Sequence, residues 1–507
     1  MQALHIDGNS LTFDALREVV YERRAVLLAP DAREAVERAR GVVEELLAGD
    51  KVAYAVNTGV GKLSDVRIKP EQVRELQENL MRSHCVGVGA PLAEPEVRAM
   101  MLLRANSLAK GNSGVRAAVI DTFCEMLNRG VHPVVPSQGS VGASGDLAPL
   151  AHLGIVLMGE GEATFEGRRL SGADAMKAAG VKTLALEAKE AISLINGTQG
   201  MLAVGALALL AAETLVDSAD VLGAMSLDAL RGTDAAFDER IHQARPHPGQ
   251  LRTAANLRKL LEGSALRESH RDCARVQDAY SLRCMPQVHG AVRDALAGAR
   301  ATFAIEMNSA VDNPLVFVEK SGASVIISGG NFHGEPLAFA LDFLAIALGA
   351  LAGISERRLE RLVNPALNEG LPPFLAPEPA GLNSGFMMAQ VTAAALVSEN
   401  KVLAHPASAD SITTSGNKED FVSMGMGAAL KLRQVLANTT NVLAIEALAA
   451  VQALDLLAPL KTSARLEKAR AAVRAISPRV LKDRNIAAEI ARTAESLQKG
   501  DLLPALR

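Results

Sequence analysis

Long runs of alanine and leucine with almost no polar side chains limit most strongly how this chain can fold. Residues 337–362 read LAFALDFLAIALGALAGISERRLERL, which predicts a long helix buried on nearly all sides. Segments 385–402 and 425–460 have a similar composition and predict two more long helices. Aromatic residues make up only 3% of the chain, so the core must consist mainly of Leu, Ala, Val and Met. Such side chains suit closely packed helices.

Shorter segments carry the start and stop signals of other elements. In residues 31–50 apolar side chains recur at helical spacing, with Pro30 before them and Gly49 after them, so we expect a helix there. Alternating strand patterns are scarce and short, as at residues 3–6 and 324–327. The chain is therefore predicted to be mainly α.

The order of these patterns predicts two regions. Residues 1–196 form an irregular N-terminal region, and residues 197–507 form a bundle of long helices with a C-terminal helical part. The most apolar stretches, Met201–Ala212 and Phe343–Ile354, are short for a membrane span, so we expect no membrane partner.

Charge and cysteine content exclude several classes of function. A formal net charge of −4 argues against a nucleic-acid partner, because neutralising phosphates requires a basic excess. The histidines show no zinc-binding spacing, so we expect no metal. No signal-peptide pattern opens the chain, and the few cysteines form no disulfide framework, which favours reduced thiols and a cytoplasmic location. The four cysteines are Cys85, Cys124, Cys273 and Cys284.

The most unusual segment is residues 137–150, SQGSVGASGDLAPL. It lacks the G-K-[ST] end of a phosphate-binding loop and the G-x-S-x-G pattern of a hydrolase nucleophile. In Ala143-Ser144-Gly145 the amide nitrogen of Gly145 can approach the carbonyl carbon of Ala143, because glycine has no side chain to block it. Ring closure with loss of water, including the hydroxyl of Ser144, would give a five-membered ring with an exocyclic methylidene. Such a ring is an electrophile that no ordinary side chain supplies.

The segment GSVGASGDLAPLAH resembles the signature of the aromatic amino acid ammonia-lyases, which build a methylidene-imidazolone group from Ala-Ser-Gly. Further segments similar to those of this family follow in the expected order along almost the whole chain. They are YAVNTGVGKL (54–63), NLMRSHCVGVG (79–89), LINGTQ (194–199), VQDAYSLRCMPQVHG (276–290), DNPLV (312–316), SGGNFHGEP (328–336), GLNSGFM (381–387) and SGNKEDFVSMG (415–425).

The resemblance implies the fold, the prosthetic group and the assembly. The fold would be the long-helix bundle of the fumarase/aspartase-like superfamily, with the prosthetic-group loop in the irregular N-terminal region. A 4-methylidene-imidazol-5-one would form autocatalytically from Ala143, Ser144 and Gly145, without an external cofactor. The protein would be a homotetramer whose active sites each draw on three chains, and its partner would be a small amino acid substrate.

The resemblance also implies roles for residues outside the loop. Tyr54 matches the base that removes the substrate β-proton, and Tyr280 matches a second active-site tyrosine. An ordinary phenol has a pKa near 10, so the anion of Tyr54 would need nearby cations or donors to act at neutral pH. Arg283 would clamp the substrate carboxylate with its planar fork. It lies three residues after Tyr280, so both project from one helical face or one tight turn.

Other positions match residues that surround the ring and the substrate. Asn196, Gln277 and Asn331 match family positions that hydrogen-bond the prosthetic ring, the substrate carboxylate or the loop. Phe332 matches the apolar wall beside the ring. Asp146 is expected to fix the geometry of the loop.

Two positions favour one substrate. His84 matches the position that contacts the substrate side chain, and Glu419 matches an acidic residue typical of family members that act on histidine. An imidazole has both a donor and an acceptor, so a carboxylate with a histidine suits it. We therefore expect L-histidine to be converted to trans-urocanate and ammonia, with a tyrosine ammonia-lyase or aromatic aminomutase as the alternative. Lys418 and Phe421 flank Glu419 where bacterial relatives often carry Gln and His.

Overall fold

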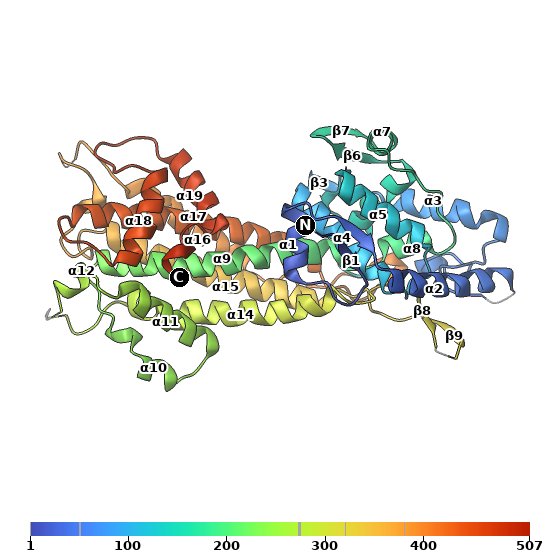
Figure 1. The fold of residues 1–507 in the computed structure, drawn as a ribbon, viewed down its shortest axis with the longest axis horizontal. Coiled ribbons are helices and arrows are strands. Elements are labelled where there is room, and N and C mark those ends of the chain that lie inside the picture. Colours follow the sequence, from blue (N-terminus) through green and yellow to red (C-terminus); the bar gives the residue numbers. More distant parts are fainter. Residues whose placement is uncertain (1, 50–51, 272–274, 320, 380) are drawn as a thin grey trace. The chain divides into compact units, whose positions relative to one another are not determined.

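The computed structural model describes residues 2–49, 52–271, 275–319, 321–379 and 381–507 (Figure 1). The chain forms two compact units. Unit 1 consists of Met1–Leu207, Arg300–Leu341 and Pro406–Leu430, and unit 2 consists of Ala208–Ala299, Asp342–His405 and Lys431–Arg507. Helices dominate both units, which confirms the predicted mainly α fold. The predicted division between residues 196 and 197 stays a prediction.

All the strands of the described residues lie in unit 1, where they form small sheets. β1 pairs with β2 in parallel, β3 pairs with β5 antiparallel, β4, β6 and β7 form an antiparallel sheet, and β8 and β9 form a hairpin. The predicted short strands at residues 3–6 and 324–327 are confirmed as β1 and β9. The strands are β1 (Leu4–Ile6), β2 (Val26–Leu28), β3 (Val88–Pro91), β4 (His132–Pro133), β5 (Pro136–Gln138), β6 (Glu162–Phe165), β7 (Arg168–Ser171), β8 (Leu315–Val318) and β9 (Ser324–Ile327).

Helices α1, α2 and α5 of unit 1 pack against α4, whose residues from Glu96 to Ala109 are all buried. The helix predicted near residues 31–50 is confirmed as α2, which starts at Pro30 and is closed by Gly49. Proline suits the first turn of a helix because its missing N–H has no partner there. The helices are α1 (Phe13–Tyr21), α2 (Pro30–Ala48), α3 (Val73–His84), α4 (Glu94–Ala109), α5 (Ala117–Arg129), α6 (Leu147–Gly154), α7 (Gly172–Ala178) and α8 (Glu190–Ile195).

Four long helices contribute residues to both units: α9 (Gln199–Ala229), α14 (Met285–Glu306), α15 (Glu335–Val363) and α17 (Gly425–Leu456). The three long helices predicted from the Ala/Leu-rich segments are confirmed as α15, α16 (Met387–Leu403) and α17. The other helices of unit 2 are α10 (Glu239–Gln243), α11 (Pro248–Leu261), α12 (Ala265–Glu268), α13 (Tyr280–Arg283), α16 (Met387–Leu403), α18 (Ala464–Ile476) and α19 (Ala487–Lys499).

Helices α9, α15 and α17 are long and apolar enough to cross a membrane by length and composition, with mean hydropathies of 1.7, 2.2 and 1.2. The stretches Met201–Ala212 and Phe343–Ile354 belong to α9 and α15, so the argument that they are too short was wrong. In each of these helices the percentage of buried residues can be given for an apolar stretch of 18 residues. It is 78% in α9 and 83% in α17, but only 56% in α15. Helix α15 therefore keeps an exposed apolar face.

The core of unit 2 contains a buried ion pair between α15 and α17. Nε and Nη2 of Arg358 donate to the two carboxylate oxygens of Glu446 at 2.6 and 2.9 Å, and both side chains are fully buried. The hydroxyls of Ser226 and Ser355 donate to the same carboxylate. Two buried charges thus satisfy one another with good geometry, as charges inside a protein must.

Candidate active site

A pocket of about 480 Å³ in unit 1 gathers residues from distant parts of the sequence. Seven of the site residues predicted from the sequence line it: Tyr54, His84, Ala143, Ser144, Asn196, Phe332 and Glu419. The pocket is also lined by Asn313 and His333, which were not predicted as site residues. Both lie in family-like segments, DNPLV and SGGNFHGEP, and membership of those segments was the only sequence signal that pointed to them.

The Ala143-Ser144-Gly145 loop is held in an unusual backbone conformation. Ser144 and Gly145 have φ angles of 54° and 72°, in the left-handed region that side-chain-bearing residues rarely adopt. A Cβ atom on Gly145 would overlap the backbone of Gly197, which lies against the loop. The N–H of Asp146 donates to the carbonyl of Gly197 at 2.7 Å, and the N–H of Gly197 donates to the carbonyl of Ser144 at 3.3 Å. Only glycine therefore fits at position 145.

Asp146 ties this loop to the start of α9. Its Oδ1 accepts a hydrogen bond from the hydroxyl of Ser140 at 2.8 Å, and its Oδ2 accepts from the N–H of Met201 at 2.8 Å. The side chain is fully buried, and burial raises the pKa of Asp146 to about 6 against the opposing effect of these donors. This geometry agrees with the expected role of Asp146 in fixing the loop.

Glu419 faces the residue that would be consumed in ring formation. Its Oε1 accepts a hydrogen bond from the hydroxyl of Ser144 at 2.9 Å, and its Oε2 accepts from the hydroxyl of Thr414 at 2.7 Å. The backbones of Thr414 and Glu419 also pair, with Thr414 N–H donating to Glu419 O at 2.8 Å. The carboxylate is thus fixed at both oxygens and lies within reach of anything bound at Ser144.

The pocket presents a phenol and an imidazole from two further segments. The hydroxyl oxygen of Tyr54 accepts a hydrogen bond from the N–H of Gly61 at 3.2 Å, a donor of the kind that a phenolate requires. Nδ1 of His84 lies 2.8 Å from the carbonyl of Leu80. Because a carbonyl can only accept, Nδ1 carries the proton and Nε2 is left as an acceptor. Burial lowers the pKa of His84, so the ring is neutral at pH 7.

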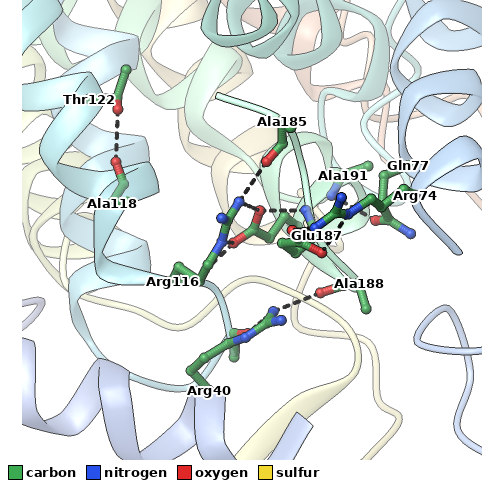
Figure 2. A network of polar contacts seen from close by, with 12 residues as sticks. Arg40, Arg74, Gln77, Arg116, Ala118, Thr122, Ala185, Glu187, Ala188 and Ala191 are labelled. Carbon is green, nitrogen blue, oxygen red and sulfur yellow. Dashed lines mark hydrogen bonds and ion pairs between the residues drawn. The ribbon is translucent and has the colours of Figure 1, made fainter. Parts of the chain in front are cut away.

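Asn196 enters the pocket from the end of α8, and the segment before this helix is firmly anchored. Figure 2 shows Arg116 and Arg40 reaching this segment, where Arg116 donates to Ala185 O at 2.7 Å and Arg40 donates to Ala188 O at 3.0 Å. Arg116 also pairs at 2.7 Å with Glu190, which is fully buried at the start of α8. These contacts fix the helix that carries Asn196.

The remaining predicted site residues do not line this pocket. Gln277, Tyr280 and Arg283 belong to unit 2, and the side chain of Tyr280 is 71% exposed. The guanidinium of Arg283 lies 4.5 Å from the ring centre of Tyr280, which confirms that both project from one face of a short helix, α13. Asn331 lies in unit 1 but is exposed, and its Nδ2 donates to Ala310 O at 3.1 Å.

Two of the thiols, those of Cys85 and Cys124, are unreactive at neutral pH. Cys85, Cys124 and Cys284 are free, and burial raises the pKa of Cys85 and of Cys124 to about 12. A thiol with such a pKa stays protonated at neutral pH and is a poor nucleophile. Cys273 lies outside the described residues. Among the described residues, no group of three or more His, Cys, Asp or Glu side chains could hold a metal ion.

A comparison with protein families decides the classification. The model of the family described as aromatic amino acid lyase matches residues 11–475. The chain belongs to the aromatic amino acid lyase family. Membership confirms both the resemblance seen in the sequence and the prediction that the protein is a lyase.

Individual members of the aromatic amino acid lyase family are similar over their full lengths. The chain is 70% identical to the histidine ammonia-lyase of Koribacter versatilis (strain Ellin345), covering 100% of both chains. It is 42% identical to the solved histidine ammonia-lyase from Trypanosoma cruzi, with a TM-score of 0.91 over 100% of this chain and 95% of the other. It is also 40% identical to the tyrosine aminomutase from Streptomyces globisporus, with a TM-score of 0.93 over 99% and 98% of the two chains.

Proposed function

We propose that this protein is a carbon–nitrogen lyase that converts L-histidine to trans-urocanate and ammonia. The observation that carries the proposal is the presence of both His84 and Glu419 in the pocket that also contains Ser144. Two acceptors in one pocket, Nε2 of His84 and the carboxylate of Glu419, suit a substrate ring that donates a hydrogen bond. The 70% identity to a histidine ammonia-lyase over the whole chain supports the same substrate.

We propose that Ala143, Ser144 and Gly145 form the 4-methylidene-imidazol-5-one for which the family is known. The residues fit this group. Gly145 lies where any Cβ would overlap Gly197, and left-handed φ angles at Ser144 and Gly145 bend the chain sharply at the tripeptide. Once formed, the group supplies the electrophile that turns the substrate amine into a leaving group.

The chain's own residues then bind the substrate and move its proton. Tyr54 removes the β-proton, and the N–H of Gly61 stabilises the negative charge that its oxygen carries as a base. Nε2 of His84 accepts a hydrogen bond from the imidazole N–H of the substrate. Glu419, held by Thr414, orients the same ring, and Phe332 supplies an apolar wall of the pocket.

A tyrosine ammonia-lyase or aromatic aminomutase is the second candidate. The similarity to a solved tyrosine aminomutase, at a TM-score of 0.93, supports this second candidate. A phenol could donate its O–H to Nε2 of His84, but it offers little that the charged carboxylate of Glu419 would stabilise. For this reason histidine is the better substrate for the pocket.

We propose further that the protein is a cytoplasmic homotetramer that needs no external cofactor and no membrane or nucleic-acid partner. Gln277, Tyr280 and Arg283 do not line the unit 1 pocket, so in this proposal other copies of the chain supply them. The face of α15 that carries Phe339 and Phe343 supports the assembly, since both rings are 58% exposed. Exposed apolar faces of this kind usually meet another chain.

A spectrophotometric assay with histidine, tyrosine and phenylalanine side by side tests the proposed function. The expected result is rapid formation of urocanate from histidine and little or no product from the other two. Formation of coumarate or of a β-amino acid from tyrosine, without urocanate from histidine, would establish the second candidate instead. Size-exclusion chromatography with light scattering tests the tetramer in the same preparation.

A further inference from the structure

Asn313 is a buried residue of the pocket wall whose contacts join two parts of the site. It lies between α14 and β8, and only 8% of it is exposed. We propose that Asn313 is a positioning residue, which fixes Asn196 and the segment that leads to Phe332 in one geometry. The inference rests on the proposed function, because the groups it positions face the substrate.

The first contact orients the carboxamide of Asn196. Its Nδ2 donates to the backbone carbonyl of Asn313 at 3.2 Å. A carbonyl can only accept, so the NH₂ group of Asn196 must face Asn313 and the Oδ1 atom must face away from it. That oxygen is buried and has no hydrogen-bond partner among the described residues. A buried acceptor is costly when unpaired, so Oδ1 is the atom offered to a donor on the substrate.

The second pair of contacts holds the segment that leads to Phe332. Oδ1 of Asn313 accepts a hydrogen bond from the N–H of Gly329 at 2.7 Å and from the hydroxyl of Ser328 at 3.1 Å. These residues lie four and three positions before Phe332, which lines the pocket. One residue therefore holds Asn196 through its main chain and the Phe332 segment through its side chain.

Asn313 is itself fixed by a buried ion pair. Its N–H donates to Oδ1 of Asp312 at 2.7 Å, and Oδ2 of Asp312 lies 2.9 Å from Nζ of Lys189. The side chains of Lys189 and Asp312 are 0% and 1% exposed. The hydroxyl of Ser193 bridges the pair, donating to Asp312 at 2.8 Å and accepting from Lys189 at 2.9 Å.

These contacts tie both ends of α8 to two consecutive residues. Lys189 caps the N-terminus of α8 and bonds Asp312, while Asn196 caps its C-terminus and bonds Asn313. A short helix clamped at both ends cannot shift without breaking a buried contact. The orientation of Asn196 in the pocket thus depends on Asn313.

The variant Asn313→Ala removes the acceptor for Ser328 and Gly329. We expect kcat for histidine to fall by about 10²-fold, the effect of small misplacements around reacting groups, with a smaller change in KM. Ring content, measured as the loss of two water molecules in the intact mass, should stay at the wild-type level. A kcat indistinguishable from that of the wild type, with normal ring content, would overturn the inference.

A pair of milder variants tests whether Asn313 is a positioning residue even if Asn313→Ala does not fold. Ser328→Ala deletes one donor to Asn313, whereas Ser328→Thr keeps the hydroxyl, and Ser328 is exposed enough to accept the extra methyl group. Ser328→Ala should lower kcat and Ser328→Thr should restore it. Ser321→Ala, in the exposed turn of the same β8–β9 hairpin, is the matched control and should leave kcat unchanged. Equal kcat values in both Ser328 variants would contradict the inference.

Failure of the proposed function would be seen separately. A wild type that turns over none of the three amino acids would refute that function without reference to Asn313. Calorimetric binding of L-histidine would then test the inference alone. A Kd at least tenfold weaker in Asn313→Ala supports it, and an unchanged Kd overturns it.

Discussion

The hydroxyl of Ser144 donates a hydrogen bond to Oε1 of Glu419 at 2.9 Å, although the two residues are 275 positions apart in the chain. The contact joins the residue that would form the electrophile to the residue that favours an imidazole substrate. It depends on the return of Pro406–Leu430 to unit 1, where the hydroxyl of Ser423 donates to Gly142 O at 2.9 Å. In the proposed function, the electrophile and the substrate preference would therefore arise from neighbouring residues.

Ser144→Ala should abolish both the ring and the activity. Without the hydroxyl there is no leaving group for the methylidene, while the methyl side chain fits the same space. Intact-mass measurement should show the wild type lighter than its sequence by two water molecules and the variant at its full sequence mass. Circular dichroism should show equal helix content in both. Near-normal urocanate production by Ser144→Ala would refute the prosthetic group.

Glu419→Gln should reduce histidine turnover far more than stability. Glutamine keeps the size of the side chain and the backbone pairing with Thr414, but it removes the negative charge that faces the substrate. We expect kcat/KM for histidine to fall by about 10²-fold or more, the range of acid–base and charge effects at active sites. Thermal unfolding should change little. Glu166→Gln, at an exposed hairpin turn, is the control and should change neither activity nor stability. Equal losses of activity and stability in Glu419→Gln would instead assign Glu419 a structural role.

Local features of this fold could be predicted from the sequence because they depend on neighbouring residues. Pro30 and Gly49 bound α2, and the spacing of Tyr280 and Arg283 places them on one face of α13. The Ala143–Gly145 tripeptide likewise carries its chemistry in three consecutive residues. In each case the physical cause lies within one or two turns of chain.

Contacts between distant segments could not be predicted in this way. Asn313 is held in the pocket wall by hydrogen bonds with Asn196 and Ser328. No local sequence pattern links either residue to Asn313. The exposed position of Tyr280 in unit 2 could not be predicted either, because a motif states which residue is present and not where the fold places it. Burial and partners are properties of the whole fold.

Arg358→Met should strongly destabilise the protein. The change leaves the carboxylate of Glu446 fully buried with only the hydroxyls of Ser226 and Ser355 as donors. Breaking a buried ion pair from one side costs about 3–5 kcal/mol. Arg271→Met removes one partner of an exposed pair, since the side chains of Arg271 and Glu268 are 68% and 66% exposed, and it should cost at most about 1 kcal/mol. Denaturant unfolding measures both, and equal losses would contradict the buried pair's role.

His132 should make the protein less stable in mild acid. Its Nε2 lies 3.0 Å from Nη1 of Arg98 and 3.4 Å from Nη1 of Arg23, and because arginine only donates, this nitrogen must be an unprotonated acceptor. Nδ1 lies 3.6 Å from the carboxylate of Glu94. Burial, reinforced by Arg98 and Arg23 and opposed by Glu94, lowers the pKa of His132 to about 4.

The direction of the pH effect follows from this shift. An unfolded chain takes up a proton at His132 near its ordinary pKa of about 6.5, whereas the folded chain does not until about pH 4. The stabilisation is therefore complete above pH 6.5 and is lost as the pH falls toward 4. Between pH 7 and pH 5 the loss from this one residue should be about 2 kcal/mol.

His132→Gln isolates this effect, because a glutamine oxygen can accept from Arg98 but does not titrate. The free energy of unfolding, measured by denaturant titration at pH 7 and pH 5, should fall less in the variant than in the wild type. His247→Gln, at an exposed histidine before α11, should keep the wild-type pH dependence. If His132→Gln lost as much stability as the wild type over this interval, the imidazole would not be the group that titrates, and the acid sensitivity would belong to other buried groups.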